Sequence, residues 1–337
     1  RVAGGSDLMK VRMDRRSGER LGSPNRVMSH APFGEFDIAA DGRTLAYQRE
    51  TPTRQIWALT IEGPAARTRV NARQLTSGTN QHGTPAISPD GKLVAFARDD
   101  ESERNFYVTP FAGGAPRLIG ATRSDQLSPC WSSDGRRLAF AAADSSAPGV
   151  LIADLSGQRP RQFGGRPIRL FLGTTAWSPD GKTLLYPSEN ARRYIVLNFE
   201  QNHESVLTPP DSVGWLYAPL FSPDGHDLVI TGVRDNLSAR LWQVALADGR
   251  WTPLGGSEAG FARPLVWADD GWIYYVVERE IRRMRANGGQ AVSYATLPIA
   301  CDWTQLSMAR DARHLVCTVT ESRPDIWIAT DFDPDVR

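Results

Sequence analysis

The side chains best able to do chemistry in this chain are a handful of histidines and three cysteines. The five histidines are His30, His82, His203, His226 and His314. Imidazoles brought together from separate segments can bind a transition metal, but only His30 and His82 precede segments that we expect to be inner strands. Because two such ligands do not complete a metal site, we expect neither a metal nor another cofactor.

The cysteines, Cys130, Cys301 and Cys317, are too few and too widely spaced for a disulfide framework. Cys130 and Cys317 occupy positions that other copies of a repeat fill with apolar residues, so we expect both to be small buried hydrophobes. Cys301 falls in a connecting segment with no histidine near it at ligand spacing. We expect no catalytic cysteine.

Several established motifs are missing from the sequence. There is no Gly-x-Ser-x-Gly, no His-Glu-x-x-His, no phosphate-binding loop with lysine and no Cys-x-x-Cys. These absences exclude the corresponding serine-hydrolase, zinc-protease and nucleotide-binding mechanisms within this chain. A net charge of +1 argues against nucleic-acid binding, and the lack of an apolar run of about 18 residues argues against membrane contact by this segment.

A repeated turn organises the chain. The following pattern occurs seven times: an apolar segment, an Asp-Gly turn or a degenerate form of it, and a second apolar segment. The turns are marked by Asp41, Asp90, Asp134, Asp180, Asp224, Asp270 and Asp311, which are 41 to 49 residues apart. This spacing is close to the roughly 40 to 45 residues of one four-stranded propeller blade.

Each turn is predicted to join the two inner strands of a blade. In Ser178-Pro179-Asp180-Gly181 the proline fixes one dihedral, the aspartate accepts from nearby backbone N–H groups, and the glycine tolerates a positive φ. A third strand such as Ile56 to Leu59 follows in each repeat, and Gly-rich links such as Gly113-Gly114 lead to a fourth. The repeats begin near residues 36, 85, 129, 175, 219, 264 and 306.

The two ends of the chain are predicted to complete one another. The last repeat stops after its third strand, Ile326 to Ala329, while residues 1–30 hold two strands, Leu8 to Met13 and Pro24 to Met28. We therefore predict an all-β, seven-bladed β-propeller with four-stranded antiparallel blades, a single domain over residues 1–337. One N-terminal strand beside Ile326 would close the ring, and the other has no assigned place.

The loops that precede the inner strands should border one mouth of the central channel. The candidate binding residues in these loops are Gln81, His82, Asp125, Gln126, Trp215, Tyr217, Arg263, Asp302, Trp303 and Gln305, with Phe261 nearby. Aromatic faces beside polar groups can hold a sugar, a peptide end or a loop of a partner protein. The aromatic residues could instead serve as packing between blades.

These motifs resemble a known family. The Ser-Pro-Asp-Gly-x-x-Leu-x-Phe repeats, the Ile-Trp third strands and the Gly-Gly-x-Pro-x-x-Leu links are similar to the WD-repeat-like propeller repeats of TolB-type proteins, over Leu8 to Ala329. That family supplies no catalytic motif to transfer. The turns at Ala39 to Gly42 and Ala309 to Ala312 depart from the pattern, so the first and last blades are expected to be less regular.

The ends of the chain resemble a second group of proteins. Ser322 to Trp327 with Asp331 to Pro334, and Leu8 to Arg12 with Asp14 to Gly18, are similar to the C-terminal propellers of bacterial membrane serine/threonine kinases and winged-helix regulators. The resemblance implies a non-enzymatic sensory or interaction domain of a larger signalling protein. It also implies a place outside the cytoplasm. The partner that we expect at the channel mouth, from the loop residues above, is a protein, a saccharide or another small molecule.

Two alternatives stay open. A polysaccharide lyase or hydrolase would need His30, His82, Asp125, Arg263 or Asp302 to converge at the channel mouth. The propeller half of a prolyl-oligopeptidase-like peptidase would need a hydrolase domain outside this segment. Because propellers host many functions, fold alone does not choose among the three.

Overall fold

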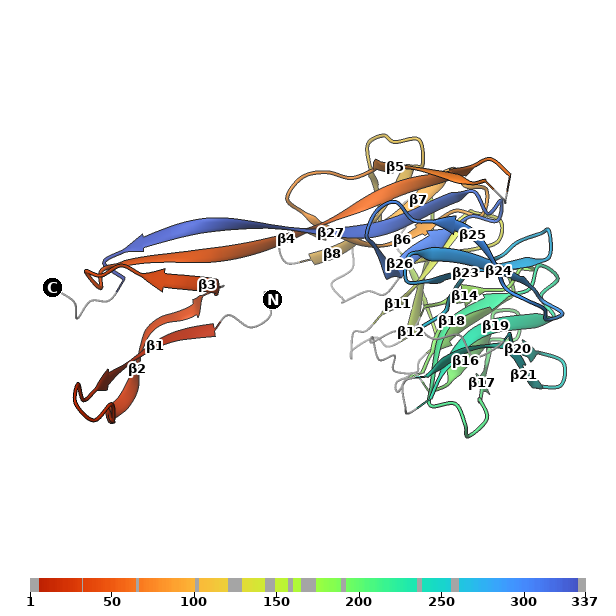
Figure 1. Cartoon of the computed structure of the whole chain (residues 1–337). Coiled ribbons are helices and arrows are strands. Elements are labelled where there is room, and N and C mark those ends of the chain that lie inside the picture. Colours follow the sequence, from red (N-terminus) through yellow and green to blue (C-terminus); the bar gives the residue numbers. More distant parts are fainter. Residues whose placement is uncertain are drawn as a thin grey trace. The chain divides into compact units, whose positions relative to one another are not determined.

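The computed structural model describes residues 6–31, 33–64, 67–100, 103–120, 129–142, 149–156, 160–164, 174–188, 192–234, 238–255 and 261–332. Every element of regular secondary structure assigned within these ranges is a β-strand (Figure 1), which confirms the all-β prediction. No helix long and apolar enough to cross a membrane occurs in them. The chain divides into unit 1, Arg1–Thr53 with Glu321–Arg337, and unit 2, Arg54–Thr320.

Unit 2 contains five four-stranded antiparallel sheets, each made of strands that are consecutive in the sequence. They are β6 (Gln81–Ile87), β7 (Leu93–Asp100), β8 (Glu103–Pro110) and β9 (Arg117–Gly120); β10 (Cys130–Trp131), β11 (Arg137–Ala142), β12 (Gly149–Asp154) and β13 (Arg161–Phe163); β14 (Ala176–Trp177), β15 (Thr183–Pro187), β16 (Tyr194–Asn198) and β17 (His203–Leu207); β18 (Trp215–Phe221), β19 (Asp227–Val233), β20 (Ala239–Ala245) and β21 (Trp251–Leu254); β22 (Arg263–Trp267), β23 (Trp272–Val277), β24 (Glu280–Arg285) and β25 (Val292–Thr296). This arrangement confirms the four-stranded antiparallel blade.

A further sheet joins strands from the two ends of the sequence, and we call it the joining sheet. It has five strands, namely β26 (Cys301–Met308), β27 (His314–Thr330), β4 (Thr44–Glu62), β5 (Arg69–Gln74) and, in unit 1, β3 (Phe33–Ile38). Within unit 2 the later part of β4 pairs with the earlier part of β27, and the Ile61 N–H donates to the Arg313 carbonyl oxygen at 2.8 Å. Strands made early in the chain are thus hydrogen-bonded to strands made late.

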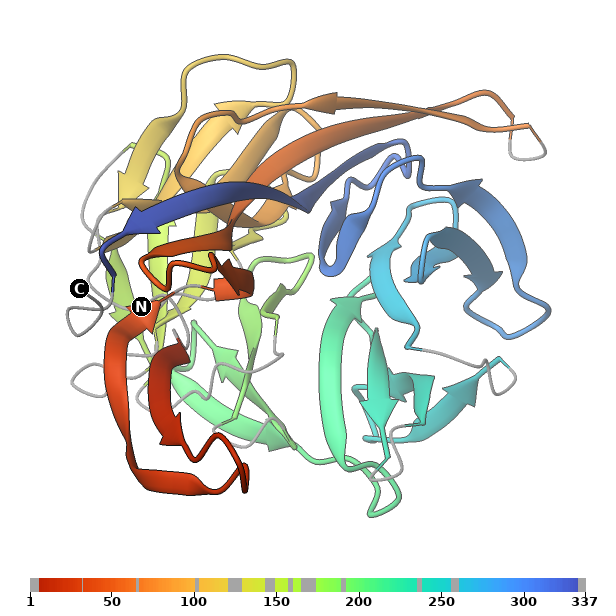
Figure 2. The same ribbon diagram turned by 60° about the vertical axis from the view of Figure 1, so that its left-hand side comes forward.

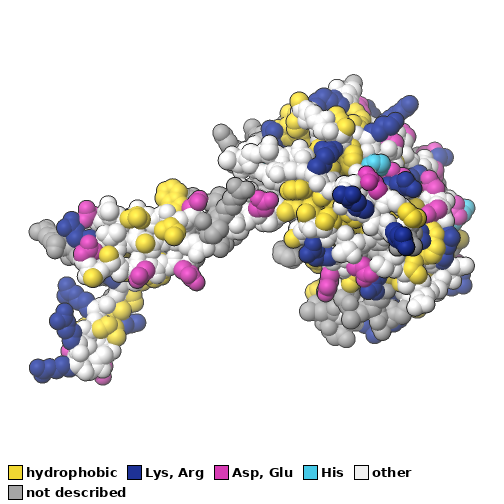
Figure 3. Space-filling model, turned by 45° about the horizontal axis from the view of Figure 1, so that its top comes forward, with side chains coloured by type: hydrophobic (Ala, Val, Ile, Leu, Met, Phe, Trp, Pro, Cys, Tyr) yellow, Lys and Arg dark blue, Asp and Glu magenta, His cyan; other side chains and the backbone are white. Residues whose placement is uncertain are grey.

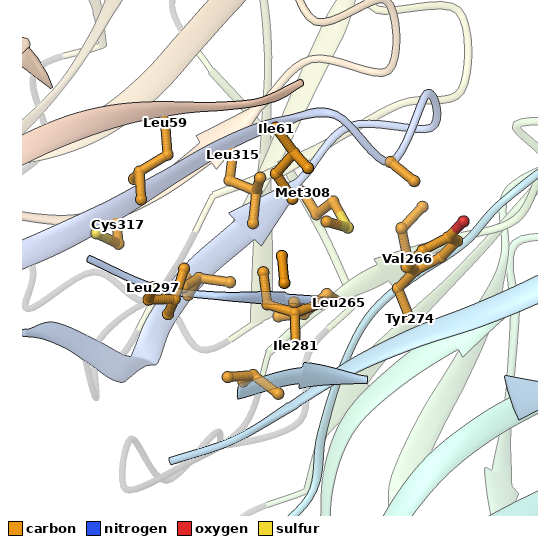
Figure 4. Packing of buried hydrophobic residues seen from close by; sticks show 14 of the residues in the cluster. Leu59, Ile61, Leu265, Val266, Tyr274, Ile281, Leu297, Met308, Leu315 and Cys317 are labelled. Atoms are coloured by element: carbon orange, nitrogen blue, oxygen red, sulfur yellow. The ribbon is translucent and has the colours of Figure 1, made fainter. Parts of the chain in front are cut away.

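Apolar side chains fill the space between successive sheets of unit 2. One cluster packs Leu59 of β4 and Leu315 of β27 against Leu265 of β22 and Ile281 of β24 (Figure 4). On the other side of the joining sheet, Ile56, Ala309 and Val316 pack against β6 and β7. Figure 2 shows these sheets following one another around the unit in sequence order. A strand placed between two neighbouring sheets must be apolar on both faces.

The seven predicted hairpins are all present. In the Ser-containing turns, the Ser178 hydroxyl donates to Asp180 at 2.6 Å and accepts the Thr183 N–H at 2.9 Å. Ser88, Ser132 and Ser222 make the same pair of bonds. Six hairpins lie in unit 2 and the one at Asp41 lies in unit 1.

Unit 1 is built from two small groups of strands. β1 (Ser6–Met13) pairs with β2 (Arg20–Ala31), and β3 (Phe33–Ile38) pairs with the first part of β4, which also pairs with β27. Arg43 donates to Asp331 across this second group. Apolar side chains are present on the visible surface of this unit (Figure 3). The prediction of seven blades and of an N-terminal closing strand stays a prediction.

One strand assignment needs correction. Ile56 to Leu59 forms a strand, as predicted, but it continues from Thr44 as part of β4 with no turn between them, and it belongs to the joining sheet. β27 likewise runs unbroken from His314 to Thr330. Each long strand contains an X-Pro pair, Thr51-Pro52 or Arg323-Pro324, and the residue before proline favours extended backbone.

The expectation for two of the cysteines was wrong. Cys317 is buried, but it forms a disulfide with Cys301, which is the first residue of β26 and not part of a connecting loop. The bulge between Cys301 and Leu306 shifts the register of β26 against β27, which brings these cysteines within reach of each other. A pairing set by a bulge is invisible in the spacing of the residues.

Candidate functional site

A cavity of about 210 Å³ lies in unit 2 among the innermost strands of the sheets. β6, β10, β14, β18, β22 and β26, or the residues just before them, each contribute to its wall. Because these are the first strands of their sheets, the cavity is the channel at the centre of the unit. At roughly 30 Å³ per water, it has room for about seven waters or a small chemical group.

The backbone is strained where two of these strands enter the wall. Thr84 and Ala218 have φ values of 49° and 52°, although neither is glycine, and each precedes a proline. The register of both strands shifts at the same point. Non-glycine residues at positive φ cost free energy and cluster at functional sites. This geometry makes the channel wall a candidate functional site.

Gln305 holds the strained Thr84 segment against β26. Its Oε1 accepts the Thr84 backbone N–H at 2.8 Å and the Thr318 hydroxyl at 2.9 Å. The Thr84 hydroxyl itself is buried, and it has no hydrogen-bond partner among the described residues. It lines the cavity as a polar group available to an occupant.

An aromatic cluster lies beside the channel wall. The rings of Tyr217 and Trp303 are 6.2 Å apart between centroids and nearly perpendicular, and Phe261 lies 5.9 Å from Trp303. Tyr217 is on β18 and Trp303 on β26, and Phe261 is just before β22. Three neighbouring sheets therefore each contribute one ring.

Arg263, at the start of β22, is the cation of this cluster. Its side chain is only 8% exposed. The Nη1 group donates to the carbonyl oxygens of Leu306 and, at 3.4 Å, Trp303, and the guanidinium lies 5.9 Å from the Tyr217 ring centroid. In the part of the chain that the structure describes it pairs with no carboxylate, and its Nε has no partner. A buried charge without a counter-ion is costly.

The surroundings of Tyr217 favour its neutral form. Burial raises the pKa of the Tyr217 hydroxyl, Arg263 opposes that rise, and Asp302 adds to it. The Asp302 carboxylate accepts the Thr304 N–H at 2.9 Å and the Thr304 hydroxyl at 2.5 Å. Asp302 is therefore hydrogen-bonded within its own turn, and the Tyr217 hydroxyl stays a potential donor.

The predicted site residues divide into three groups. Tyr217, Arg263 and Trp303 contact one another, and Asp302 and Gln305 flank them on β26. Gln81 and His82 begin β6, where the His82 ring packs 5.6 Å from Phe96 in the sheet core, and Trp215 begins β18 and is 40% exposed. Asp125 and Gln126 lie outside the described residues.

No group of three or more potential metal ligands occurs in the described ranges. Cys130 lines the channel, and desolvation raises its pKa to about 11, so its thiol is protonated at neutral pH. The arrangement offers binding groups, namely aromatic faces, hydroxyls and a cation.

Among the described residues that line the channel, sequence reasoning named Arg263 and Gln305 and missed the others, including Thr84 and Arg310. Thr84 could have been found from the X-Pro pairs that precede the inner strands, since Thr84-Pro85, Ala218-Pro219 and Arg263-Pro264 share the position. Arg310 takes the turn position that Pro89 fills in the first complete sheet, and both line the cavity. Arg310 could have been found from the degenerate turn Ala309 to Ala312, because arginine stands there in place of the usual proline.

Three solved structures share this fold at low sequence identity. A putative TolB from Agrobacterium tumefaciens has a TM-score of 0.60 at 16% identity, covering 80% of this chain and 99% of that chain. TolB from Acinetobacter baumannii has a TM-score of 0.51 at 16% identity, covering 81% and 66%. The oligogalacturonate lyase of Vibrio parahaemolyticus has a TM-score of 0.52 at 16% identity, covering 77% of each chain.

No curated protein matches the sequence. The family model of the TolB β-propeller domain, however, matches residues 27–213, which is more than half of the chain. The turns, sheets and central channel described above are those that a propeller requires. The chain therefore belongs to the TolB β-propeller domain family.

Proposed function

We propose that this propeller is a non-enzymatic binding module that takes a protein segment or a small ligand at the mouth of its channel. The observation that carries the proposal is the aromatic cluster of Tyr217, Phe261 and Trp303 beside a cavity with strained walls. Aromatic rings that are anchored on rigid strands offer a large apolar area at low entropic cost, and the nearby polar groups give orientation.

A ligand screen with a matched pair of variants tests this function. Peptides, neutral sugars and sugar acids would be screened by thermal shift and tryptophan fluorescence against the wild type, Trp303→Ala and Trp272→Ala. Trp303 belongs to the cluster, whereas Trp272 is a similarly half-buried indole that packs against Arg283 and Arg285. We expect at least one ligand to lose binding in Trp303→Ala only. An equal loss of ligand affinity in both variants would contradict the proposal. A screen in which no ligand binds the wild type would contradict it as well.

The biological setting we propose is the interaction domain of a larger bacterial signalling protein, outside the cytoplasm. The Cys301–Cys317 disulfide supports that location, because structural disulfides persist in oxidising compartments. Mass spectrometry of the native protein purified from its own host would test this. A free thiol at both positions in the native protein would argue for a reducing compartment.

A lyase or hydrolase acting at the channel mouth is the second candidate, favoured by the shared fold with an oligogalacturonate lyase. It would use Arg263 and Asp302, which flank the aromatic cluster. Incubation with oligogalacturonate, followed by ultraviolet detection of unsaturated product, is the direct assay. Product that disappears in Arg263→Gln and persists in Arg234→Gln would replace the binding proposal with the enzyme.

We also propose that the strands of unit 1 form a seventh blade, with an N-terminal strand in the outer place beside the end of β27. The order β3, β4, β27 supports this proposal, because it supplies the first three strands of a blade and leaves one edge for a fourth. Hydrogen exchange of the whole chain tests it. Slow exchange in β1 and in residues 326–330 is expected, and fast exchange in either segment would contradict it.

A further inference from the structure

The charges on the channel wall indicate what kind of group the channel receives. Among the described residues that line the cavity, the charged ones are Arg263 and Arg310, and no aspartate or glutamate is present. The other described lining residues are threonines, serines, a glutamine, a cysteine and apolar side chains such as Pro85, Pro219 and Pro264. Cations and hydroxyl donors, with no carboxylate among the described lining residues, favour an anion.

Of the two arginines, Arg263 gives the stronger evidence that the channel receives an anion. Its side chain is more than nine-tenths buried, its Nη1 is occupied by backbone carbonyls, and its Nε has no partner among the described residues. Carbonyl oxygens satisfy N–H groups but do not neutralise the charge. Removing a guanidinium from water without a counter-ion is unfavourable, and an incoming anion would relieve that cost.

The geometry favours a carboxylate over other anions. The Nε side of a guanidinium presents parallel N–H donors that match the two oxygens of a carboxylate. The adjacent Tyr217 hydroxyl and the Thr84 hydroxyl also lack hydrogen-bond partners in the described residues, and each can donate one more bond. The cavity volume of about 210 Å³ is sufficient for a carboxylate group with a short stem.

We propose that the channel mouth binds a carboxylate group, with Arg263 as its main partner and the rings of Tyr217 and Trp303 packing against the stem. This inference rests on the binding function proposed above and names its ligand class. The carboxylate can belong to a free small acid or to a protein segment, as a chain end or an acidic side chain. Both sources present the same group to Arg263.

The experiment compares neutral and charged forms of the same probes on the whole chain. N-acetylleucine and N-acetylleucinamide represent small molecules, and acetyl-Gly-Ser-Gly-Leu with a free or an amidated end represents a protein segment. Affinity is measured by tryptophan fluorescence, with inorganic phosphate as a different anion. We expect at least one free carboxylate to bind about 10-fold or more tightly than its amide, because a charge-assisted hydrogen bond is lost in the amide.

Three variants assign the effect to Arg263. Arg263→Gln should reduce carboxylate affinity about 10-fold or more and reduce amide affinity by much less. Arg263→Lys should retain part of the carboxylate affinity, because the charge remains without the fork. Arg234→Gln, which removes an exposed arginine of the same unit, should change neither. The probe comparison on the wild type needs no variant, so the test survives if Arg263→Gln fails to fold.

The outcomes separate this inference from the function beneath it. Equal binding of carboxylates and amides, or binding of phosphate but of neither carboxylate, would overturn the carboxylate proposal and leave a binding channel. Binding of none of these probes would overturn the carboxylate proposal, and a negative library screen would overturn the binding function as well. Tighter binding of the peptide than of the small acid would identify a protein segment as the source.

Discussion

Two strands with nearly the same sequence have opposite surroundings in this molecule. Ile56-Trp57-Ala58 lies in unit 2, where Ile56 is 0% exposed, and Ile326-Trp327-Ile328 lies in unit 1, where Ile326 is 80% exposed. Both are predicted third strands of a repeat. The comparison shows that a repeat specifies a strand locally, whereas its burial depends on whether other sheets pack against both faces.

The first strands of the hairpins show the same contrast. Ile38 of β3 is 41% exposed. Six residues of unit 2 hold the same repeat position. Phe221 is half-buried, and the other five are buried, namely Ile87, Trp131, Trp177, Trp267 and Met308. Unit 1 therefore carries blade-type sequence on surfaces that the structure leaves open, and unit 2 carries the packed core.

The largest expected effect comes from truncating the two isoleucines. Ile56→Ala should lower the free energy of unfolding by about 2–5 kcal/mol, because it leaves a cavity between sheets. Ile326→Ala should change it by less than about 0.5 kcal/mol, as for other exposed sites. Urea unfolding followed by fluorescence measures both. A loss of several kcal/mol for Ile326→Ala would break the comparison, since it would mean that another sheet or partner covers that face.

The next effect concerns the disulfide, which is confined to unit 2. Opening the Cys301–Cys317 bridge, with a sequence separation of 16, should cost about 3 kcal/mol. Calorimetry of the wild type should show a lower melting temperature after reduction, whereas a Cys301→Ala/Cys317→Ala variant should not respond to reductant. Cys130→Ala, which leaves the bridge intact, should respond like the wild type. An unchanged wild-type melting temperature would contradict the prediction.

A smaller effect separates the two kinds of turn. Ser178→Ala removes the hydroxyl that bonds Asp180 and the Thr183 N–H, and should cost about 1 kcal/mol. In unit 1 the corresponding residue is Ala39, and Asp41 itself accepts the Thr44 N–H at 3.2 Å. Ala39→Ser should therefore gain little, because that N–H already has an acceptor. Thermal unfolding of both variants measures the difference, and a gain at Ala39 as large as the loss at Ser178 would be unexpected.

The smallest effect is acid sensitivity. Hydrogen bonds from Ser178 and from the Lys182 backbone lower the pKa of Asp180, against a smaller opposing effect of burial. Its ionised form is thus favoured by folding, so this stabilisation is present above about pH 3.9, the unfolded value, and is lost as pH falls through the lower folded value. Asp180→Asn should be less stable than wild type at pH 7, and the gap should close below pH 4. A stability difference between the two proteins that is independent of pH would mean that the ionisation of Asp180 does not contribute to it.

Local features of the fold were predictable and long-range pairings were not. The hairpins follow from Ser-Pro-Asp-Gly and its variants because four or five neighbouring residues make all the bonds of the turn. The unbroken course of β4 and the Cys301–Cys317 pair depend on partners far away in the sequence or on a bulge. Within the candidate site, Tyr217, Arg263 and Trp303 meet because they enter three successive inner strands, a consequence of the repeat. The burial of His82 against Phe96 had no such signal.

The joining sheet also has a consequence for how the protein is made on the ribosome. Five sheets of unit 2 use strands that leave the exit tunnel one after another, so each can pair during translation. β4 and β5 emerge before all of them, while β26 and β27, their sheet mates, emerge last. The edge of β4 that pairs with β27 must therefore stay unpaired until synthesis is nearly complete. A chain released early would present that edge to other nascent chains, and aggregation by strand addition would be its characteristic failure.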